Sequence, residues 1–243
     1  MKALGRWLLW LLLALLALQL YFIVRIGLMR WVDPDSTAFQ RSEAWRIATT
    51  QGSLRWRQEW VPYARISDHL KRAVLASEDD EFVDHDGVAW EAIEKAWQRN
   101  SRAEELAARR AAQGRAAGRP PKIVGGSTIT QQLAKNLFLS GERTFLRKGQ
   151  EFVFTLALEA LLDKRRILEI YLNSVEWGEG VFGAEAAARH YYRKGASQLG
   201  PYEAARLAVM LPRPKHFEKL PASGYLAERA GVIQARMGGI RLP

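Results

Sequence analysis

The chain has 243 residues, 48% of them hydrophobic and 26% charged, a composition typical of a folded protein with one large domain or two small ones. It has no cysteine, which excludes disulfides, thiolate zinc sites and cysteine nucleophiles. The 36 Lys and Arg residues exceed the 26 Asp and Glu residues, so an anionic partner is expected, whether nucleic acid, anionic lipid or a phosphorylated substrate.

The first expected element is a membrane-spanning helix. Residues 7–24, WLLWLLLALLALQLYFIV, carry no charge, and a helix of that length nearly spans a bilayer core at about 1.5 Å per residue. A cleaved signal peptide is the alternative, but no A-x-A site is present and Arg25 directly follows the apolar run. We therefore expect an uncleaved anchor over residues 1–30. The arginines and lysines on its two sides do not by themselves place the rest of the chain outside the cytoplasm.

Helical patterns dominate the chain after the anchor. A polar connection leads to residues 54–60, whose alternation fits a short strand or an extended surface segment. From Asp68 onward apolar residues recur at helical spacing, and Asp68 is the expected N-cap of the first helix. Further helices are expected in WEAIEKAWQRN, STITQQLAKNLFL, FLRKGQEFVFTLALEALL, DKRRILEIYLN, AEAAARHYY and GPYEAARLAVML. These patterns predict a mainly α protein with one soluble domain of about 210 residues.

Three stretches carry more specific expectations. Residues 98–121 are rich in Ala, Arg and Gly and end in two prolines, so we expect a mobile surface excursion there. The stretch EWGEGVFG has three glycines in six residues, which predicts a loop whose backbone closely approaches another group. The helix after Glu151 is so apolar that we expect it to lie in the core.

Residues 77–87, SEDDEFVDHDG, place six carboxylates in nine positions, with one histidine among them. If the preceding helix continued, Glu78, Phe82 and His85 would share one face. A solvated helix end is the commoner explanation of such a run. The spacing does not fit an EF-hand, and the zinc pattern H-E-x-x-H is absent. Two interpretations therefore remain, a cluster of solvated surface carboxylates and a catalytic carboxylate.

A stripe of hydrogen-bond donors is expected on the helix of GGSTITQQLAK. Thr128, Gln132 and Lys135 align on one helical face, with Gln131 beside them and an apolar stripe opposite. Hydroxyls, amides and a lysine near a helix start would suit a phosphate or a sugar. A capped amphipathic helix with a solvated polar face explains the same pattern. The stretch is not a P-loop, because the G-x-x-x-x-G-K-[ST] order is missing.

A charge cluster follows in RTFLRKGQE. Arg147 and Lys148 precede Glu151 by four and three residues, as they would in intrahelical ion pairs. The helix turns apolar directly after Glu151, which draws these charges toward the core, where a charge must be paired or functional. Arg143 adds another cation nearby.

Taken in order, these segments resemble the motifs of the peptidoglycan glycosyltransferases of family 51. EDDEFVDHDG resembles the first motif, E-D-x-x-F-x-x-H-x-G, and GGSTITQQLAKNLFL resembles the second. RKGQE resembles the third, R-K-x-x-E, while KRRILEIYLN and GVFGAEAAARHYY resemble the fourth and fifth. The resemblance runs from about residue 61 to residue 214. The S-x-x-K and K-T-G motifs of an appended transpeptidase domain are absent, so the monofunctional branch of the family is expected.

The resemblance implies a lysozyme-like lobe beside a small membrane-proximal jaw lobe, preceded by the transmembrane helix. It divides the chain into an anchor at 1–30, a connecting and jaw-side segment at 31–60, and a catalytic domain at 61–243. It also implies a single-pass protein of the bacterial inner membrane with its catalytic domain in the periplasm. The implied activity is polymerisation of lipid II into β-1,4 glycan strands with release of undecaprenyl diphosphate, in cell wall biogenesis and without transpeptidase activity.

The resemblance also assigns roles to the residues singled out above. Glu78 is implied to be the general base of an inverting displacement. Glu151 is implied to be catalytic, either by orienting Arg147 and Lys148 or by helping to hold a divalent cation, Mg or Mn, on the diphosphate. The implied substrate-binding residues are Thr128, Gln131, Gln132, Lys135, Arg143, Arg147 and Lys148. The residues implied to shape the site are Asp79, Phe82 and His85. No other cofactor is expected, and no metal ligand is assigned.

The expected partners are lipid II, the undecaprenyl-diphosphate-linked glycan, membrane lipids, and other cell-wall synthesis or division proteins, with no nucleic acid. Two alternatives stay open. A lysozyme-like peptidoglycan hydrolase or lytic enzyme would share the fold and would not need a cluster of cations for a diphosphate. A non-enzymatic, membrane-anchored cell-wall scaffold would not depend on Glu78.

Overall fold

The structure is a computed structural model that describes residues 2–91, 127–139 and 144–243, together with isolated positions between 94 and 109. Arg143 and most of the excursion expected at 98–121 lie outside the described residues. The described part is mostly helical with a small three-stranded sheet, which confirms the mainly α fold class.

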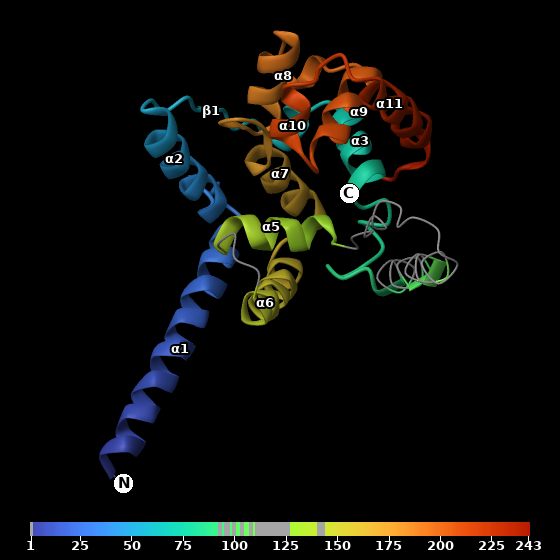
Figure 1. The fold of residues 1–243 in the computed structure, drawn as a ribbon. Coiled ribbons are helices and arrows are strands. Elements are labelled where there is room, and N and C mark those ends of the chain that lie inside the picture. The colour runs from blue at the N-terminus through green and yellow to red at the C-terminus, as the bar shows by residue number, and fades with distance from the viewer. Residues whose placement is uncertain are drawn as a thin grey trace.

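The first helix, α1 (Lys2–Leu28), projects away from the rest of the molecule (Figure 1). Its stretch Ala3–Leu28 has a mean hydropathy of 2.4 and, within the described ranges, is the one helix long and apolar enough to cross a membrane. The end of α1 belongs to the folded core, since Ile26 and Met29 are buried and Arg166 Nε donates to the carbonyl of Met29 at 2.7 Å. This agrees with the expected anchor, although a signal sequence has the same length and composition.

After α1 come α2 (Ala38–Gln51), β1 (Arg57–Gln58), the 3₁₀ helix η1 (Tyr63–Arg65) and α3 (Asp68–Glu78). Ser67, and not Asp68, is the N-cap of α3, because its hydroxyl accepts a hydrogen bond from the amide of His69 at 3.2 Å.

α3 ends at Glu78, so the expected placement of Glu78, Phe82 and His85 on one continuous helical face is wrong. The chain leaves the helix at Asp79, with φ −166° and ψ 76°, because the Asp79 carboxylate is held by the amide of Ile129 and by His85. Residues 80–87 form turns and bends.

The remaining elements are α5 (Ile129–Phe138), α6 (Phe145–Leu161), α7 (Lys164–Ser174), β2 (Glu176–Gly178), β3 (Val181–Phe182), α8 (Ala184–Tyr192), η2 (Ala196–Gln198), α9 (Pro201–Met210), α10 (Pro214–Glu218), α11 (Gly224–Arg236) and η3 (Met237–Gly239). Figure 1 shows α5 crossing the middle of the molecule, between α6 and the lobe that contains α3 and α7 to α11. α3 packs against α9 and α11, while α5 packs against α2, α6 and α7. One hydrophobic core joins these elements through buried side chains such as Leu133, Tyr171 and Trp177.

The glycine-rich stretch EWGEGVFG forms the hairpin of β2 and β3. β3 pairs with β2 in antiparallel and with β1 in parallel orientation, which gives the strand order β1-β3-β2. Gly180 has φ +70°, and a Cβ there would lie 2.1 Å from the carbonyl oxygen of Arg55. The expected close approach of the backbone is therefore confirmed, although it occurs in a hairpin and not in a loop.

The expected placement of the helix after Glu151 wholly in the core is wrong. On α6, Phe154 and Leu158 are buried, but Phe152, Val153 and Leu156 are 39%, 46% and 45% exposed. α6 packs against α5, α1 and α7, but these three apolar side chains stay partly exposed. An apolar surface beside a helix that can span a membrane would be stable in contact with lipid. The apolar sequence of α6 alone does not show whether its side chains contact lipid or the protein core.

Candidate functional site

Glu78 is held between three helices. It is the last residue of α3, and its Oε2 accepts a hydrogen bond from Nε2 of Gln132 on α5 at 3.0 Å. Oε1 of Gln132 in turn accepts a hydrogen bond from the hydroxyl of the buried Tyr171 on α7 at 3.0 Å. Burial raises the pKa of Tyr171 well above its usual value, so the hydroxyl stays protonated and keeps donating. The position of the Glu78 carboxylate is therefore fixed from α5 and α7.

Burial raises the pKa of Glu78, with the charge of Asp79 acting in the same direction and hydrogen bonds from Gln132 and Ser77 acting against it. A carboxylate with a raised pKa is a stronger base than one in water, as a general base working near neutral pH needs to be. Glu78 is only partly buried, so a substrate hydroxyl can reach it. The geometry suits proton abstraction.

Asp79 joins the loop after α3 to the start of α5. Its Oδ2 accepts from the amide of Ile129 at 2.9 Å, and its Oδ1 lies 2.9 Å from Nε2 of His85. The amide of Gly87 donates to Nδ1 of His85 at 3.1 Å, so Nε2 carries the ring proton and donates to Asp79. These contacts fit the expected site-shaping role of Asp79 and His85.

The loop is also packed against α6 and α7. Phe82 is 1% exposed, and Nζ of Lys164 lies 4.6 Å from the centre of its ring. Lys164 Nζ donates to the carbonyl of His85 at 2.5 Å and pairs with Glu159 at 2.8 Å. Gly87 has φ +81°, and a Cβ there would lie 2.8 Å from side-chain atoms of α6. Glu78 is thus followed by a loop with little freedom to move.

Replacement of Asp79 by Ala is expected to lower the free energy of unfolding by about 2–4 kcal/mol. The amide of Ile129 and the ring proton of His85 would each lose a buried partner. Chemical denaturation of the purified variant measures the loss. The matched control is Asp80→Asn, because exposed Asp80 pairs only with the half-exposed Arg236 in the described part and should change the stability by about 0.5 kcal/mol or less. Equal stability of wild type and Asp79→Ala would contradict this role.

Two of the expected substrate contacts are used within the protein. Thr128 is the N-cap of α5, where its Oγ1 accepts from the amide of Gln131 at 3.2 Å and donates to the carbonyl of Gly87 at 2.7 Å. Oε1 of Gln131 accepts from the amide of Thr128 at 3.2 Å, which completes a capping box. Both side chains are buried. Their contact with substrate stays a prediction, and the arrangement favours a structural role for both.

Gln132 and Lys135, in contrast, line a cleft of about 410 Å³. The walls of this cleft come from α2, α5, the start of α6, the residues around the start of β2, and residues 211–214. Arg147 and Glu176 of β2 line it as well. Gln132 both lines this cleft and bonds Glu78, so this side chain connects the carboxylate to the cleft.

The cations of the cleft are organised by Glu151, which is 4% exposed. Arg147 Nη1 lies 2.9 Å from its Oε2, and Lys148 Nζ contacts its Oε1. The loss of water around Lys135 lowers the pKa of that side chain, with Arg147 and Lys148 acting in the same direction and Glu151 acting against them. Three cations around one carboxylate leave an excess of positive charge, which suits an anion such as a diphosphate.

The residues around Glu151 do not fit a divalent cation held by the protein. Both oxygens of Glu151 already face cations, which would repel a metal ion. In the part of the chain that the structure describes, no group of three His, Cys, Asp and Glu residues could ligate one. Of the two roles expected for Glu151, the orientation of Arg147 and Lys148 is the one that the geometry supports.

The sequence reasoning missed Tyr171 and Glu176. Tyr171 sits on the apolar face of an amphipathic helix, where nothing in the pattern distinguishes it from an ordinary core residue. Glu176 left only a weak signal, a carboxylate directly between the apolar residues Val175 and Trp177. Arg143, an expected substrate contact, lies outside the described residues.

Comparisons with known proteins identify the family of the chain. Residues 46–238 match the family model described as Transglycosylase. Two relatives named biosynthetic peptidoglycan transglycosylase, from Burkholderia thailandensis and Burkholderia pseudomallei, are 54% identical over 95% of this chain and 84% of their own length. A protein of the same name from Burkholderia multivorans is 51% identical over 95% of this chain and 87% of its own. The chain therefore belongs to the transglycosylase family.

Proposed function

We propose that the chain polymerises lipid II into β-1,4 glycan strands and that Glu78 is the general base of the reaction. Family membership and relatives named biosynthetic peptidoglycan transglycosylase support peptidoglycan glycosyltransferase activity. The observation that carries the mechanism is a partly buried carboxylate, held by Gln132, at the edge of a cleft whose polar walls include Lys135 and Arg147.

The reaction is a single displacement at the anomeric carbon of the donor. Glu78 takes the proton from the 4-hydroxyl of the acceptor sugar as its oxygen attacks the donor's anomeric carbon. The bond from that carbon to the diphosphate oxygen breaks, and the lipid diphosphate leaves with the electron pair. One displacement inverts an α-linked donor into a β-1,4 product. Lys135, Arg147 and Lys148 stabilise the charge on the leaving group, so no second carboxyl has to protonate it.

The proposed mechanism needs no metal ion, because the cation cluster carries the positive charge that the diphosphate requires. We expect a chelator such as EDTA to change the initial polymerisation rate by about twofold or less, because the three cations neutralise the diphosphate without help. The measurement is lipid II polymerisation with and without EDTA, followed by readdition of Mg or Mn. A rate that collapses with EDTA and returns with the metal would show that a divalent cation is part of the site.

A peptidoglycan hydrolase is the alternative to be separated from this function. The purified protein is incubated with lipid II and, separately, with purified sacculi. Glycan polymer from lipid II and no release of fragments from sacculi is the expected result. Release of fragments without polymer would overturn the proposal in favour of hydrolysis, and neither product would favour a scaffold.

We also propose that α1 is retained as an inner-membrane anchor, with the catalytic domain in the periplasm. The buried Ile26 and Met29, and the hydrogen bond from Arg166 to Met29, support retention because cleavage of α1 would open the core. The exposed apolar residues of α6 support contact of this side with membrane lipids. Periplasmic placement would bring the cleft to its lipid-linked substrates and to other cell-wall synthesis or division proteins.

A further inference from the structure

One carboxylate in the cleft has no task in this mechanism. Glu176, the first residue of β2, is 6% exposed and lines the same cleft as Gln132, Lys135 and Arg147. It lies between the apolar residues Val175 and Trp177 along the chain. A buried carboxylate is costly unless it is paired or functional.

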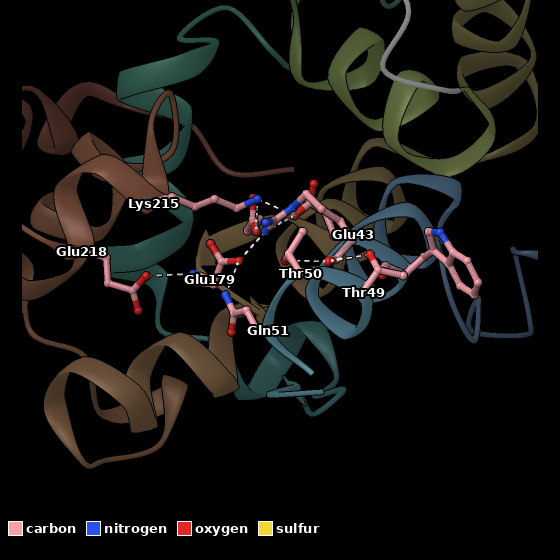
Figure 2. Close-up of polar contacts among 10 residues, drawn as sticks. Glu43, Thr49, Thr50, Gln51, Glu179, Lys215 and Glu218 are labelled. Carbon is pink, nitrogen blue, oxygen red and sulfur yellow. Dashed lines mark hydrogen bonds and ion pairs between the residues drawn. The ribbon is translucent and has the colours of Figure 1, made fainter. Parts of the chain in front are cut away.

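The pairing of Glu176 is incomplete. Its Oε1 has no hydrogen-bond partner within the described residues, although Nζ of Lys215 lies 3.3 Å away. Lys215 is shared, because it also makes a close ion pair with Glu43 of α2 (Figure 2). Glu43 is further paired with Arg46, whose guanidinium reaches Glu179. Lys215 therefore neutralises Glu176 only in part, because Oε1 has this shared ion pair and no hydrogen bond in the described part of the chain.

The charges around Glu176 agree with this incomplete pairing. Burial raises the pKa of Glu176 to about 7, with Lys215 acting against burial and with Glu43 and Glu179 acting in the same direction. Burial thus destabilises the charged form of Glu176, and a hydrogen-bond donor on a bound ligand would offset part of that cost.

We propose that Glu176 is a substrate-binding residue that accepts a hydrogen bond from a hydroxyl or acetamido N–H of an amino sugar bound in the cleft. A diphosphate is excluded as its direct partner because like charges repel, and the cations for that group lie on α5 and α6. An uncharged donor can bond the carboxylate of Glu176 without such repulsion. The inference rests on the proposed function, since it identifies which part of the lipid-linked sugar this wall recognises.

The test is equilibrium binding of fluorescent lipid II in detergent to a Glu78→Gln background, which isolates binding from turnover. Adding Glu176→Met, of similar size but without an acceptor, is expected to raise the Kd at least about tenfold. Adding Glu176→Gln, which keeps a carbonyl oxygen, should leave the Kd within about threefold. The matched control is Glu59→Gln, which removes an exposed carboxylate that pairs with Arg189 outside the cleft. It should leave the Kd unchanged.

Thermal melting of each variant separates binding from folding, and Glu176→Ser replaces Glu176→Met if the latter does not fold. An unchanged Kd for a folded Glu176→Met or Glu176→Ser variant would overturn the inference. So would an equal loss for Glu176→Gln and Glu176→Met, because the loss would then follow the charge and not the acceptor. Polymerisation of lipid II by the wild-type protein is measured alongside. If the wild type polymerises lipid II but the Glu176 variants bind it normally, the inference about Glu176 fails while the proposed function stands.

Discussion

Replacement of Glu78 by Gln is expected to lower the rate of lipid II polymerisation at least about 10²-fold, the low end for loss of a general base. The amide has nearly the same shape and can still contact Gln132, but it cannot take a proton from the acceptor hydroxyl. The measurement is the initial rate of polymer formation at saturating lipid II. The amide removes the base without disturbing the fold, since a neutral group suits this partly buried position better than a charged one.

The neighbouring Asp80 provides the control for this variant. Asp80 is exposed and pairs with Arg236 on the surface, so Asp80→Asn should keep the wild-type rate within about twofold. A Glu78→Gln protein that melts like the wild type and polymerises at its rate would contradict the assignment. That result would also favour a scaffold, whose action would not depend on this carboxylate.

Removal of the cation at Lys135 is expected to have the second large effect. Lys135→Ala should lower kcat/KM for lipid II by about 10²–10³-fold, because a charge that stabilises the leaving diphosphate in the cleft would be lost. Arg147 and Lys148 would remain, but Glu151 already neutralises one charge of that pair. Steady-state kinetics with lipid II measures the loss.

The control for Lys135→Ala is Lys219→Ala. Lys219 follows α10 and is exposed, away from the walls of the cleft, so its removal should leave kcat/KM within about twofold. Comparable losses of kcat/KM for the two variants would mean that the activity depends on the overall positive charge of the protein and not on a cation at the position of Lys135. Wild-type kinetics for Lys135→Ala would remove the cation cluster from the mechanism.

The sequence predicted the local parts of this structure well. The apolar stripe after Thr128 predicted α5, and the structure has a capping box at Thr128, one of the two possible caps in the sequence, Ser127 and Thr128. The spacing of Arg147 and Lys148 to Glu151 predicted their ion pairs. These features depend on residues three or four positions apart, which periodicity and capping rules describe.

The parts that the sequence could not predict depend on contacts distant along the chain. The end of α3 at Glu78 follows from the bond between Asp79 and Ile129, 50 positions away, so helical spacing extended the element too far. Gln132 is fixed by Tyr171, which is 39 positions away and resembles a core residue in the pattern. The surroundings of Glu176 combine α2, β2 and α10, and no local rule joins these segments.

The measurement that tests the central claim most directly is the pH dependence of lipid II polymerisation in wild type and Glu78→Gln side by side. Both are measured at saturating lipid II, so that protonation of Glu176, whose pKa burial raises to about 7, does not limit the rate through weaker binding. Glu78 works only when ionised, and burial raises its pKa above the usual 4.5, so the wild-type rate should fall as the pH drops through that raised value. An alkaline limb should lie below 10.5, where Lys135 loses its proton. The residual rate of Glu78→Gln should lack the acid limb and keep the alkaline one. An unchanged acid limb in Glu78→Gln would contradict the assignment of Glu78 as the base.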